Sequence, residues 1–333
     1  MIDAEKAALE GFMMGDALGM PTEFMTRKEI HEKFGLIDRL LEPHESKNHS
    51  DLKQGQVTDD TEQVMALLDE YCIQGRISAY DTAYRLLRWM KESGAVEKRY
   101  IGPSSKVALE AIEAGADPNT TGLRGTTCGG VMRCPSAALF ALARNASLEK
   151  SVHACLLPTH NTKPALEAGM GYAFALRAAL LGENLDTILA AALEEGAEKG
   201  ARLAPYDYCS PSLVARVEHF KSISSRFAGP DDVLDFLYNV YGASLESIDV
   251  ASAAICIFLY AAEDTWLSIR MGASLGGDTD TVAALAGALS AAYCSSRGKN
   301  LNIPGELLDK VIKVNGIDIS KVAVRLNCSL MAQ

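Results

Sequence analysis

Apolar residues recur at helical spacing along most of the chain, and the alternation that marks a half-buried β-strand is nearly absent. In residues 60–74 the apolar positions share one face of a helix, and Gly75 follows as a C-cap. Similar runs predict further helices over residues 81–93, 104–115, 134–146, 147–157, 164–181, 185–200, 211–222, 230–240, 249–262, 281–296 and 304–313. The pattern therefore favours an all-α fold.

Three glycines near the N-terminus are spaced for helix packing. Gly11, Gly15 and Gly19 fall four residues apart, which places them on one face of a helix and lets another helix approach closely. Glu23 follows Pro21, so we expect its side chain just past the end of this helix, pointing out of a turn.

Two longer stretches show no helical period. Residues 35–58 are polar, and residues 116–133 are rich in Gly and Thr. Loops of this length in a compact chain are usually functional or mobile, so both are candidates for shaping a site. The length of 333 residues alone would allow roughly two domains of about 150 residues. No linker composition, low-complexity tract or repeat divides the chain, so we predict a single domain over residues 1–333.

Charge and cysteine usage limit the classes of partner. The formal net charge of -11 argues against binding to nucleic acid or to an anionic membrane, although bound metal ions would still permit an anionic small substrate. The eight cysteines form no CxxC pair, which is typical of reduced, mostly buried thiols. No signal peptide is visible, and the most apolar run, residues 251–262, is too short to span a bilayer. A cytoplasmic location is the resulting expectation.

Two short acidic clusters carry the strongest chemical signal. The stretch GQVTDDTEQ at residues 55–63 and the stretch LGGDTDTVA at residues 275–283 each place two Asp and neighbouring Thr at the start of a predicted helix. Helix capping is the simplest interpretation, because Asp at an N-terminus accepts unpaired backbone N–H groups. Capping explains one carboxylate per helix better than two, because close carboxylates repel unless a positive charge lies between them.

A site for a hard divalent cation is the alternative interpretation. Carboxylate and hydroxyl oxygens are the ligands that Mg²⁺ and Mn²⁺ prefer, and Asp59, Asp60, Asp278 and Asp280 supply carboxylates. Together with Glu23 they make five carboxylates, which about two divalent cations would nearly neutralise. Zinc is disfavoured, because the chain has no HExxH motif and no Cys/His set at ligand spacing.

The ordered set of these motifs resembles the ADP-ribosylglycohydrolase family, which includes dinitrogenase-reductase-activating glycohydrolase and the ADP-ribosylarginine hydrolases. The resemblance runs from about residue 8 to residue 293. It is carried, in order, by Gly15-Asp16-Ala17-Leu18-Gly19, Pro21, Glu23, Thr58-Asp59-Asp60-Thr61 and Gly276-Gly277-Asp278-Thr279-Asp280-Thr281. It implies an all-α orthogonal helical bundle with two Mg²⁺ or Mn²⁺ ions in a cleft.

The resemblance also implies roles for single residues. The metal ligands would be Thr58, Asp59, Asp60, Asp278, Asp280 and Thr281. The ions would hold the 2′- and 3′-hydroxyls of a ribose and a bridging water beside its anomeric carbon. Glu23 would gate the site or assist proton transfer, so Glu23, Asp59 and Asp60 are the candidate catalytic residues. Cleavage at that carbon passes through an oxocarbenium-like centre, which nearby carboxylates and an activated water favour.

The segment at residues 125–140 resembles the glycine-rich segment that ends in Met-Arg in this family. The backbone N–H groups of Gly129 and Gly130 are candidates for binding a diphosphate, although an ordinary flexible loop would have the same composition. The candidate substrate contacts are Cys128, Gly129, Gly130, Met132, Arg133 and His160. Arg133 would contact a phosphate or support the metal-binding carboxylates. Some arginine-type hydrolases carry an acidic residue where this chain has Tyr100, so the sequence leaves the linkage open.

The function that these features favour is hydrolysis of the bond between ADP-ribose and a modified protein side chain, with arginine as the leading linkage. The substrate would be an ADP-ribosylated protein, for example the target of an ADP-ribosylating toxin or of a regulatory transferase. Alternatives are hydrolysis of serine-linked, polymeric or small-molecule ADP-ribose, a non-catalytic ADP-ribose-binding protein, and a general two-metal phosphohydrolase.

Overall fold

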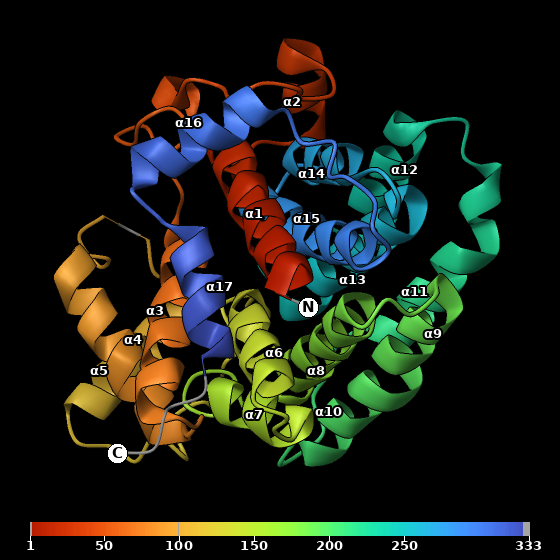
Figure 1. Ribbon diagram of the computed structural model, residues 1–333. Helices are drawn as coiled ribbons and strands as arrows, with labels where there is room; N and C mark the ends of the chain where they lie inside the picture. The colour runs from red at the N-terminus through yellow and green to blue at the C-terminus, as the bar shows by residue number, and fades with distance from the viewer. Residues whose placement is uncertain (1, 99, 329–333) are drawn as a thin grey trace.

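The computed structural model describes residues 2–98 and 100–328, and within these ranges it is helical and contains no strand (Figure 1). One isolated antiparallel bridge joins Thr127 to Glu246. The α-helices are α1 (Ile2–Gly19), α2 (Arg27–Phe34), α3 (Asp59–Gln74), α4 (Ala79–Ser93), α5 (Pro103–Glu113), α6 (Cys134–Ala143), α7 (Leu148–Leu156), α8 (Lys163–Leu180), α9 (Leu185–Ala190), α10 (Glu198–Leu203), α11 (Leu213–Ile223), α12 (Pro230–Phe236), α13 (Ser247–Ala261), α14 (Thr265–Ser274), α15 (Thr279–Ser296), α16 (Gly305–Asn315) and α17 (Ile319–Asn327). The all-α prediction is confirmed.

The predicted helices occur close to their expected positions, and the exceptions have local causes. The run predicted over residues 185–200 is continuous from α9 to α10 but passes through a π-helical segment, Ala191–Ala197. There the backbone of Gly196 presses on α8, where an added Cβ would lie 2.6 Å from the carbonyl oxygen of Met170. The run predicted over residues 230–240 likewise ends in a π-helical turn, Leu237–Tyr241.

Three helices lie outside the predicted set: α2, α14 and α17. Each begins at a side-chain cap that the sequence contains. Thr26 and Glu29 form a reciprocal capping box at the start of α2. Asp264 and Asp318 accept backbone N–H bonds at the starts of α14 and α17. The capping residues are visible in the sequence, but each helix that they begin is short.

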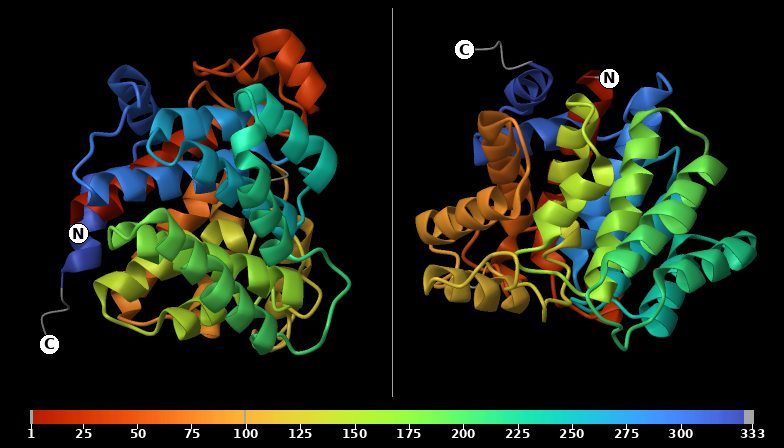
Figure 2. Two further views of the ribbon diagram at one scale, coloured as in Figure 1. Left: turned by 90° about the vertical axis from the view of Figure 1, so that its right-hand side faces the viewer. Right: turned by 90° about the horizontal axis from the view of Figure 1, so that it is seen from below.

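Helix α1 crosses α15 at the centre of the molecule, and the other helices surround this pair. Seen from below in Figure 2, α3 to α5 lie on one side and the helices from α9 to α12 lie on the other. One cluster of buried apolar residues extends from α1 to α17.

The eight cysteines are free thiols and six of them are buried, as expected. No helix in the described ranges is both long enough and apolar enough to cross a bilayer. The single-domain boundary stays a prediction.

The glycines of α1 allow the crossing, as their spacing predicted. A Cβ added to Gly11 would lie 2.5 Å from the carbonyl oxygen of Gly287, and one added to Gly15 would lie 2.2 Å from that of Ala283. A Cβ on Gly19 would lie 2.4 Å from the carbonyl oxygen of Thr279. No side chain fits in these gaps, so the two backbones are in contact at three successive turns of α1.

Replacing Gly15 with alanine should therefore destabilise the fold. Overpacking of this kind costs about 1–3 kcal/mol, which outweighs the gain of about 1 kcal/mol in helix propensity. Urea unfolding would measure the change. Gly305→Ala is the matched control, because Gly305 is also helical and an added Cβ there meets nothing within 4 Å. Equal stability of the two variants would contradict the crossing as the structure shows it.

Candidate functional site

The start of α3 is held by a carboxylate from another helix. Asp16 of α1 accepts hydrogen bonds from Thr58 N at 2.9 Å, Thr58 Oγ1 at 2.9 Å, Thr61 N at 3.0 Å and Thr61 Oγ1 at 2.5 Å. Thr58 is the N-cap and accepts from Asp60 N at 3.3 Å. The exposed N–H groups of the helix end are thus bonded by Asp16 and Thr58. The capping interpretation therefore does not account for Asp59 and Asp60.

The start of α15 is shaped by two glycines. Gly276 and Gly277 have φ of 92° and 72°, a left-handed conformation that other residues rarely adopt. A Cβ on Gly277 would lie 1.6 Å from the carbonyl oxygen of Ala243. Asp278 then occupies the N-cap position without making a side-chain cap bond, so its carboxylate is not used to end the helix.

The turn that carries Glu23 is bonded directly to this glycine loop. Phe24 N donates to the carbonyl oxygen of Gly277 at 2.8 Å, and Gly277 N donates to that of Met25 at 2.9 Å. Phe24 is one of two described non-glycine residues with positive φ, at 61°, which is a strained conformation. This pair of bonds fixes Glu23 beside the start of α15.

The carboxylates from the three segments converge. Single oxygen atoms of Asp16, Asp60 and Asp280 lie within 4.8 Å of one another, and so do ligand atoms of Glu23, His49 and Asp280. The hydroxyl of Thr281 donates to Asp60 Oδ2 at 3.1 Å. The two acidic clusters, which lie more than 200 residues apart in the sequence, therefore form one site.

The carboxylates of this site have no Lys or Arg paired with them in the described part of the chain. No Lys or Arg in the described ranges makes an ion pair with Asp59, Asp60, Asp278 or Asp280. Asp60 Oδ1 and Asp278 Oδ2 are buried and have no hydrogen-bond partner in the described part of the chain. Buried carboxylate oxygens are normally bonded, so these two point to a group that the protein does not itself supply.

Burial and mutual repulsion shift the titration of these carboxyls. Burial raises the pKa of Asp59, Asp60 and Asp280 well above the ordinary value of 3.8, and the neighbouring carboxylates raise it further. The pKa of Asp278 is raised by the same causes. Burial also raises the pKa of Asp16 to about 6, although its four hydrogen bonds oppose the shift.

A cavity of about 180 Å³ opens onto the site. Its floor contains Glu23 and the four cluster aspartates with Thr281. The irregular stretch at residues 35–58 contributes Asn48 and His49, and the stretch at residues 116–133 contributes Cys128, Gly129 and Met132, so both long loops shape the cavity. The rest of the lining is largely aromatic and apolar, and includes Phe24, Tyr100, Ile101, Pro103 and Leu245.

Four of the candidate residues do not line the cavity: Thr58, Gly130, Arg133 and His160. Thr58 lies below the floor, with its hydroxyl bonded to Asp16. Arg133 is 0% exposed; its guanidinium donates to Gln63 Oε1 at 3.1 Å and to Thr159 Oγ1 at 2.5 Å. Gln63 in turn donates to Asp59 Oδ2 at 2.8 Å. Of the two roles considered for Arg133, its contacts thus match support of the carboxylates.

His160 and Gly130 pack together in the same wall. A Cβ on Gly130 would lie 2.9 Å from that of His160, and Thr159 Oγ1 lies 2.7 Å from His160 Nδ1. Burial lowers the pKa of His160 well below its ordinary range, and the nearby charge of Arg133 lowers it further. His160 is therefore neutral and contacts protein groups in this structure.

Sequence reasoning assigned no role to Asp16, Asn48, His49 or Gln63. Asp16 lies within the Gly15–Gly19 motif, and this position is the sequence signal that marks it. Asn48 and His49 come from a loop without a period, and no local pattern indicates that they reach Glu23. Their positions depend on how the loop folds over the start of α3.

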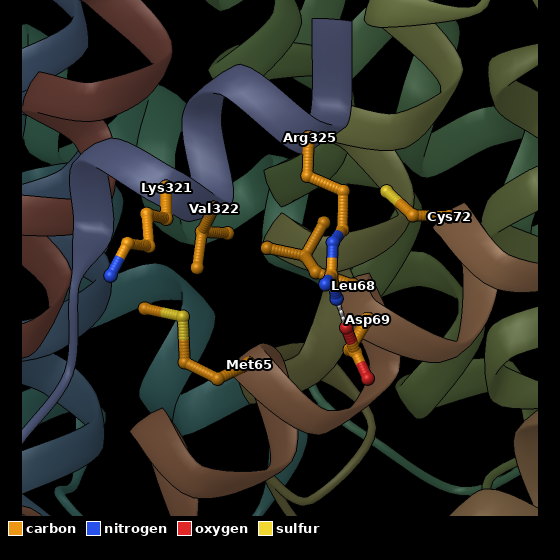
Figure 3. A pocket seen from close by; sticks show the side chains of 7 residues that line it. All are labelled: Met65, Leu68, Asp69, Cys72, Lys321, Val322 and Arg325. Atoms are coloured by element: carbon orange, nitrogen blue, oxygen red, sulfur yellow. Dashed lines mark ion pairs between the residues drawn. The ribbon is translucent and has the colours of Figure 1, made fainter. Parts of the chain in front are cut away.

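A second cavity, of about 170 Å³, lies between α3 and α17 (Figure 3). Its walls are mainly apolar, with an ion pair between Arg325 and Asp69 at one side. Cys72, on this wall, is twelve residues beyond Asp60, which corresponds to roughly 18 Å along a helix. No cluster of carboxylates converges there, so the cavity at Glu23 is the candidate functional site.

Comparison with known proteins identifies the family. The ADP-ribosylglycohydrolase family model matches residues 2–329. The uncharacterized protein YegU of Escherichia coli (strain K12) is 31% identical over 322 residues, which are 96% of this chain and 95% of that protein. ADP-ribosylarginine hydrolase Tri1 of Pseudomonas putida (strain GB-1) is 27% identical over 93% of this chain and 74% of its own length.

A solved structure described as an ADP-ribosylglycohydrolase-related protein complex shares the fold. Its TM-score to this chain is 0.71 at 25% sequence identity, and the match covers 98% of this chain and 97% of that one. The family match over nearly the whole chain agrees with the order of the acidic motifs and with their convergence at one cavity. The chain belongs to the ADP-ribosylglycohydrolase family.

Proposed function

We propose that this protein hydrolyses the glycosidic bond between ADP-ribose and a modified arginine side chain of a protein, and that it uses two divalent cations. Family membership supports a glycohydrolase that acts on ADP-ribosylated proteins. The arginine linkage is supported by the likeness to a hydrolase whose name specifies ADP-ribosylarginine. The observation that carries the metal requirement is the buried carboxylate cluster, which forms no ion pair with any Lys or Arg that the structure describes.

The residues present fit such ions. Asp59, Asp60, Asp278, Asp280 and Thr281 offer only oxygen, the donor that Mg²⁺ and Mn²⁺ prefer. The two buried oxygens without a partner belong to this set. Divalent cations bound there would balance the negative charge, hold the ribose hydroxyls and lower the pKa of a bound water.

Glu23 is placed to handle a proton in this reaction. Its Oε2 accepts from Asn48 Nδ2 at 3.0 Å and lies 2.6 Å from His49 Nε2. Among the described residues no donor is bonded to the other oxygen, Oε1. A carboxylate with one oxygen held and one available can accept a proton from an attacking water and later return it. The remaining carboxylates of the floor favour positive charge at the anomeric carbon.

The loop at residues 128–133 is the proposed contact for the diphosphate. The backbone N–H groups of Gly129 and Gly130 donate to no group in the described part of the chain. Gly129 lines the cavity, and its N–H lies near the start of a short 3-10 turn, Val131–Arg133. Backbone N–H groups in such a turn suit phosphate oxygens. Arg133 supports this loop and Asp59 from behind.

The decisive experiment measures ADP-ribose release from an ADP-ribosylated arginine substrate. Wild-type protein should release ADP-ribose with Mg²⁺ or Mn²⁺ and should lose this activity in EDTA. The Asp59→Asn/Asp60→Asn variant should be at least about 100-fold slower, because loss even of outer-shell metal partners costs 10–100-fold.

The matched control is Asp186→Asn, which removes an exposed aspartate paired with Lys221 on the surface. It should keep full activity. Absence of release by properly metallated wild-type protein would overturn the arginine linkage, and serine-linked and free ADP-ribose conjugates would then be tested. Release that continues in EDTA would overturn the metal requirement.

The metal-free protein should lose stability as the pH rises through the range where the cluster ionises. The raised pKa values mean that the folded state binds more protons than the unfolded chain from about pH 4 to about pH 6 and above. The free energy of unfolding therefore falls as pH rises in this window. Urea unfolding in EDTA would measure the fall.

Two comparisons isolate the cluster from the other titrating groups. Excess Mn²⁺ should restore stability at about pH 7, because a bound ion favours the ionised carboxylates. The Asp59→Asn/Asp60→Asn variant should show a smaller fall with pH in EDTA. The same pH dependence in both proteins would contradict the assignment of the repulsion to this cluster.

A further inference from the structure

The acidic site contains two groups of potential ligands that differ in chemistry. Asp16, Asp60 and Asp280 offer only oxygen, whereas Glu23, His49 and Asp280 include an imidazole nitrogen. Asp280 belongs to both groups, so the two positions adjoin. All of these residues are buried. The site is therefore chemically asymmetric, with nitrogen available on the side of Glu23 alone.

His49 is carried into the site by the irregular stretch at residues 35–58. Ser46 Oγ accepts from His49 N at 3.0 Å and from Asn48 N at 3.4 Å, which holds the backbone of this turn. The edge of the imidazole meets the ring of Tyr100, with ring centroids 5.4 Å apart. The side chain of His49 is 1% exposed in this position.

The polar contacts of the imidazole point into the site. Nε2 lies 2.6 Å from Glu23 Oε2 and 3.5 Å from Asn48 Nδ2. Nδ1 is buried and has no partner in the described ranges. If His49 served only to stabilise its loop, its ring nitrogens would be expected to hydrogen-bond to groups of that loop. Instead, the contact of His49 with Ser46 is made by its backbone N–H. Its ring is thus directed at the carboxylates.

The spacing is suitable for shared coordination. Bonds from divalent metals to imidazole nitrogen or carboxylate oxygen are about 2.0–2.2 Å long, so ligands on opposite sides of an ion lie about 4.2 Å apart. The ligand atoms of Glu23, His49 and Asp280 lie within 4.8 Å of one another. The unpartnered Oδ2 of Asp278 supplies a further buried oxygen in the same cluster.

We propose that Nε2 of His49 gives up its hydrogen bond to Glu23 when a metal binds, and becomes a direct ligand of the metal position between Glu23 and Asp280. This inference rests on the metal centre of the proposed function, but not on the identity of the substrate. It adds one nitrogen to an otherwise all-oxygen site. Imidazole suits the later first-row ions better than Mg²⁺ or Mn²⁺, so this position should prefer Fe²⁺ or Co²⁺, whereas the position at Asp16 and Asp60 remains suited to Mg²⁺.

The first test is a spectroscopic one on the Co²⁺-loaded full-length protein. A histidine bound to paramagnetic Co²⁺ has a ring N–H proton whose NMR signal is strongly shifted and exchanges with solvent. Wild-type protein should show one such signal, and His49→Gln should lack it. Glutamine keeps an amide donor for Glu23, so this variant separates metal ligation from simple hydrogen bonding.

His44→Gln is the matched control, because His44 lies in the same loop but is exposed. It should retain the shifted signal. Absence of the signal from Co²⁺-loaded wild-type protein, or its persistence in His49→Gln, would overturn the proposal. Circular dichroism and urea unfolding of His49→Gln would establish that the variant is folded.

Calorimetric titration gives a second readout that does not depend on activity. The affinity of His49→Gln for Co²⁺ should fall by about 10-fold or more, and its affinity for Mg²⁺ should fall less. Equal losses for the two ions, or none, would overturn nitrogen ligation. Wild-type protein that binds neither ion would instead overturn the metal centre itself, so the two failures are distinguishable.

Discussion

The contact on which the rest of the structure depends is the close crossing of α1 and α15. Three glycines of α1 bring its backbone against that of α15 with no room for a side chain. This close packing fixes the positions of Asp16 and of the turn that follows α1. Asp16, one residue after Gly15, then reaches the start of α3, and the turn after Gly19 reaches the glycine loop before α15. All three segments that carry the acidic residues of the site are placed by one helix packing.

The buried carboxylates of the site repel one another, and this repulsion destabilises the fold that holds them. Carboxylates that are buried near one another raise each other's pKa, and no Lys or Arg among the described residues pairs with them directly. The surrounding structure compensates through hydrogen bonds, with four from Thr58 and Thr61 to Asp16 and one from Gln63 to Asp59. Arg133 is buried behind Gln63, and its positive charge is linked to Asp59 only through the side chain of Gln63. Functional sites commonly hold such strain, which a bound partner relieves.

The floor and the walls of the cavity have different structural origins. The floor is formed largely by helix starts that the core holds rigidly, and it carries the two acidic clusters of the sequence. The walls come from the stretches at residues 35–58 and 116–133, which have few regular elements. His49 belongs to the first of these stretches, whereas Phe24 and Tyr100 come from other segments. A common reaction centre can therefore accept different linkages and metal ions through changes in its loops.

The amino-acid sequence determined most of the helices, though not α2, α14 and α17, and it determined the glycine face of α1 and the two acidic clusters, because each is a local pattern of spacing and residue type. It indicated that Asp59, Asp60, Asp278 and Asp280 act together, since capping needs only one carboxylate per helix. It could not place Arg133 behind the wall, assign Asp16 to the start of α3 or bring His49 to Glu23. Those contacts join segments separated by 26 to 70 residues. Only the tertiary structure decided them, because such contacts depend on how helices pack and not on any local periodicity.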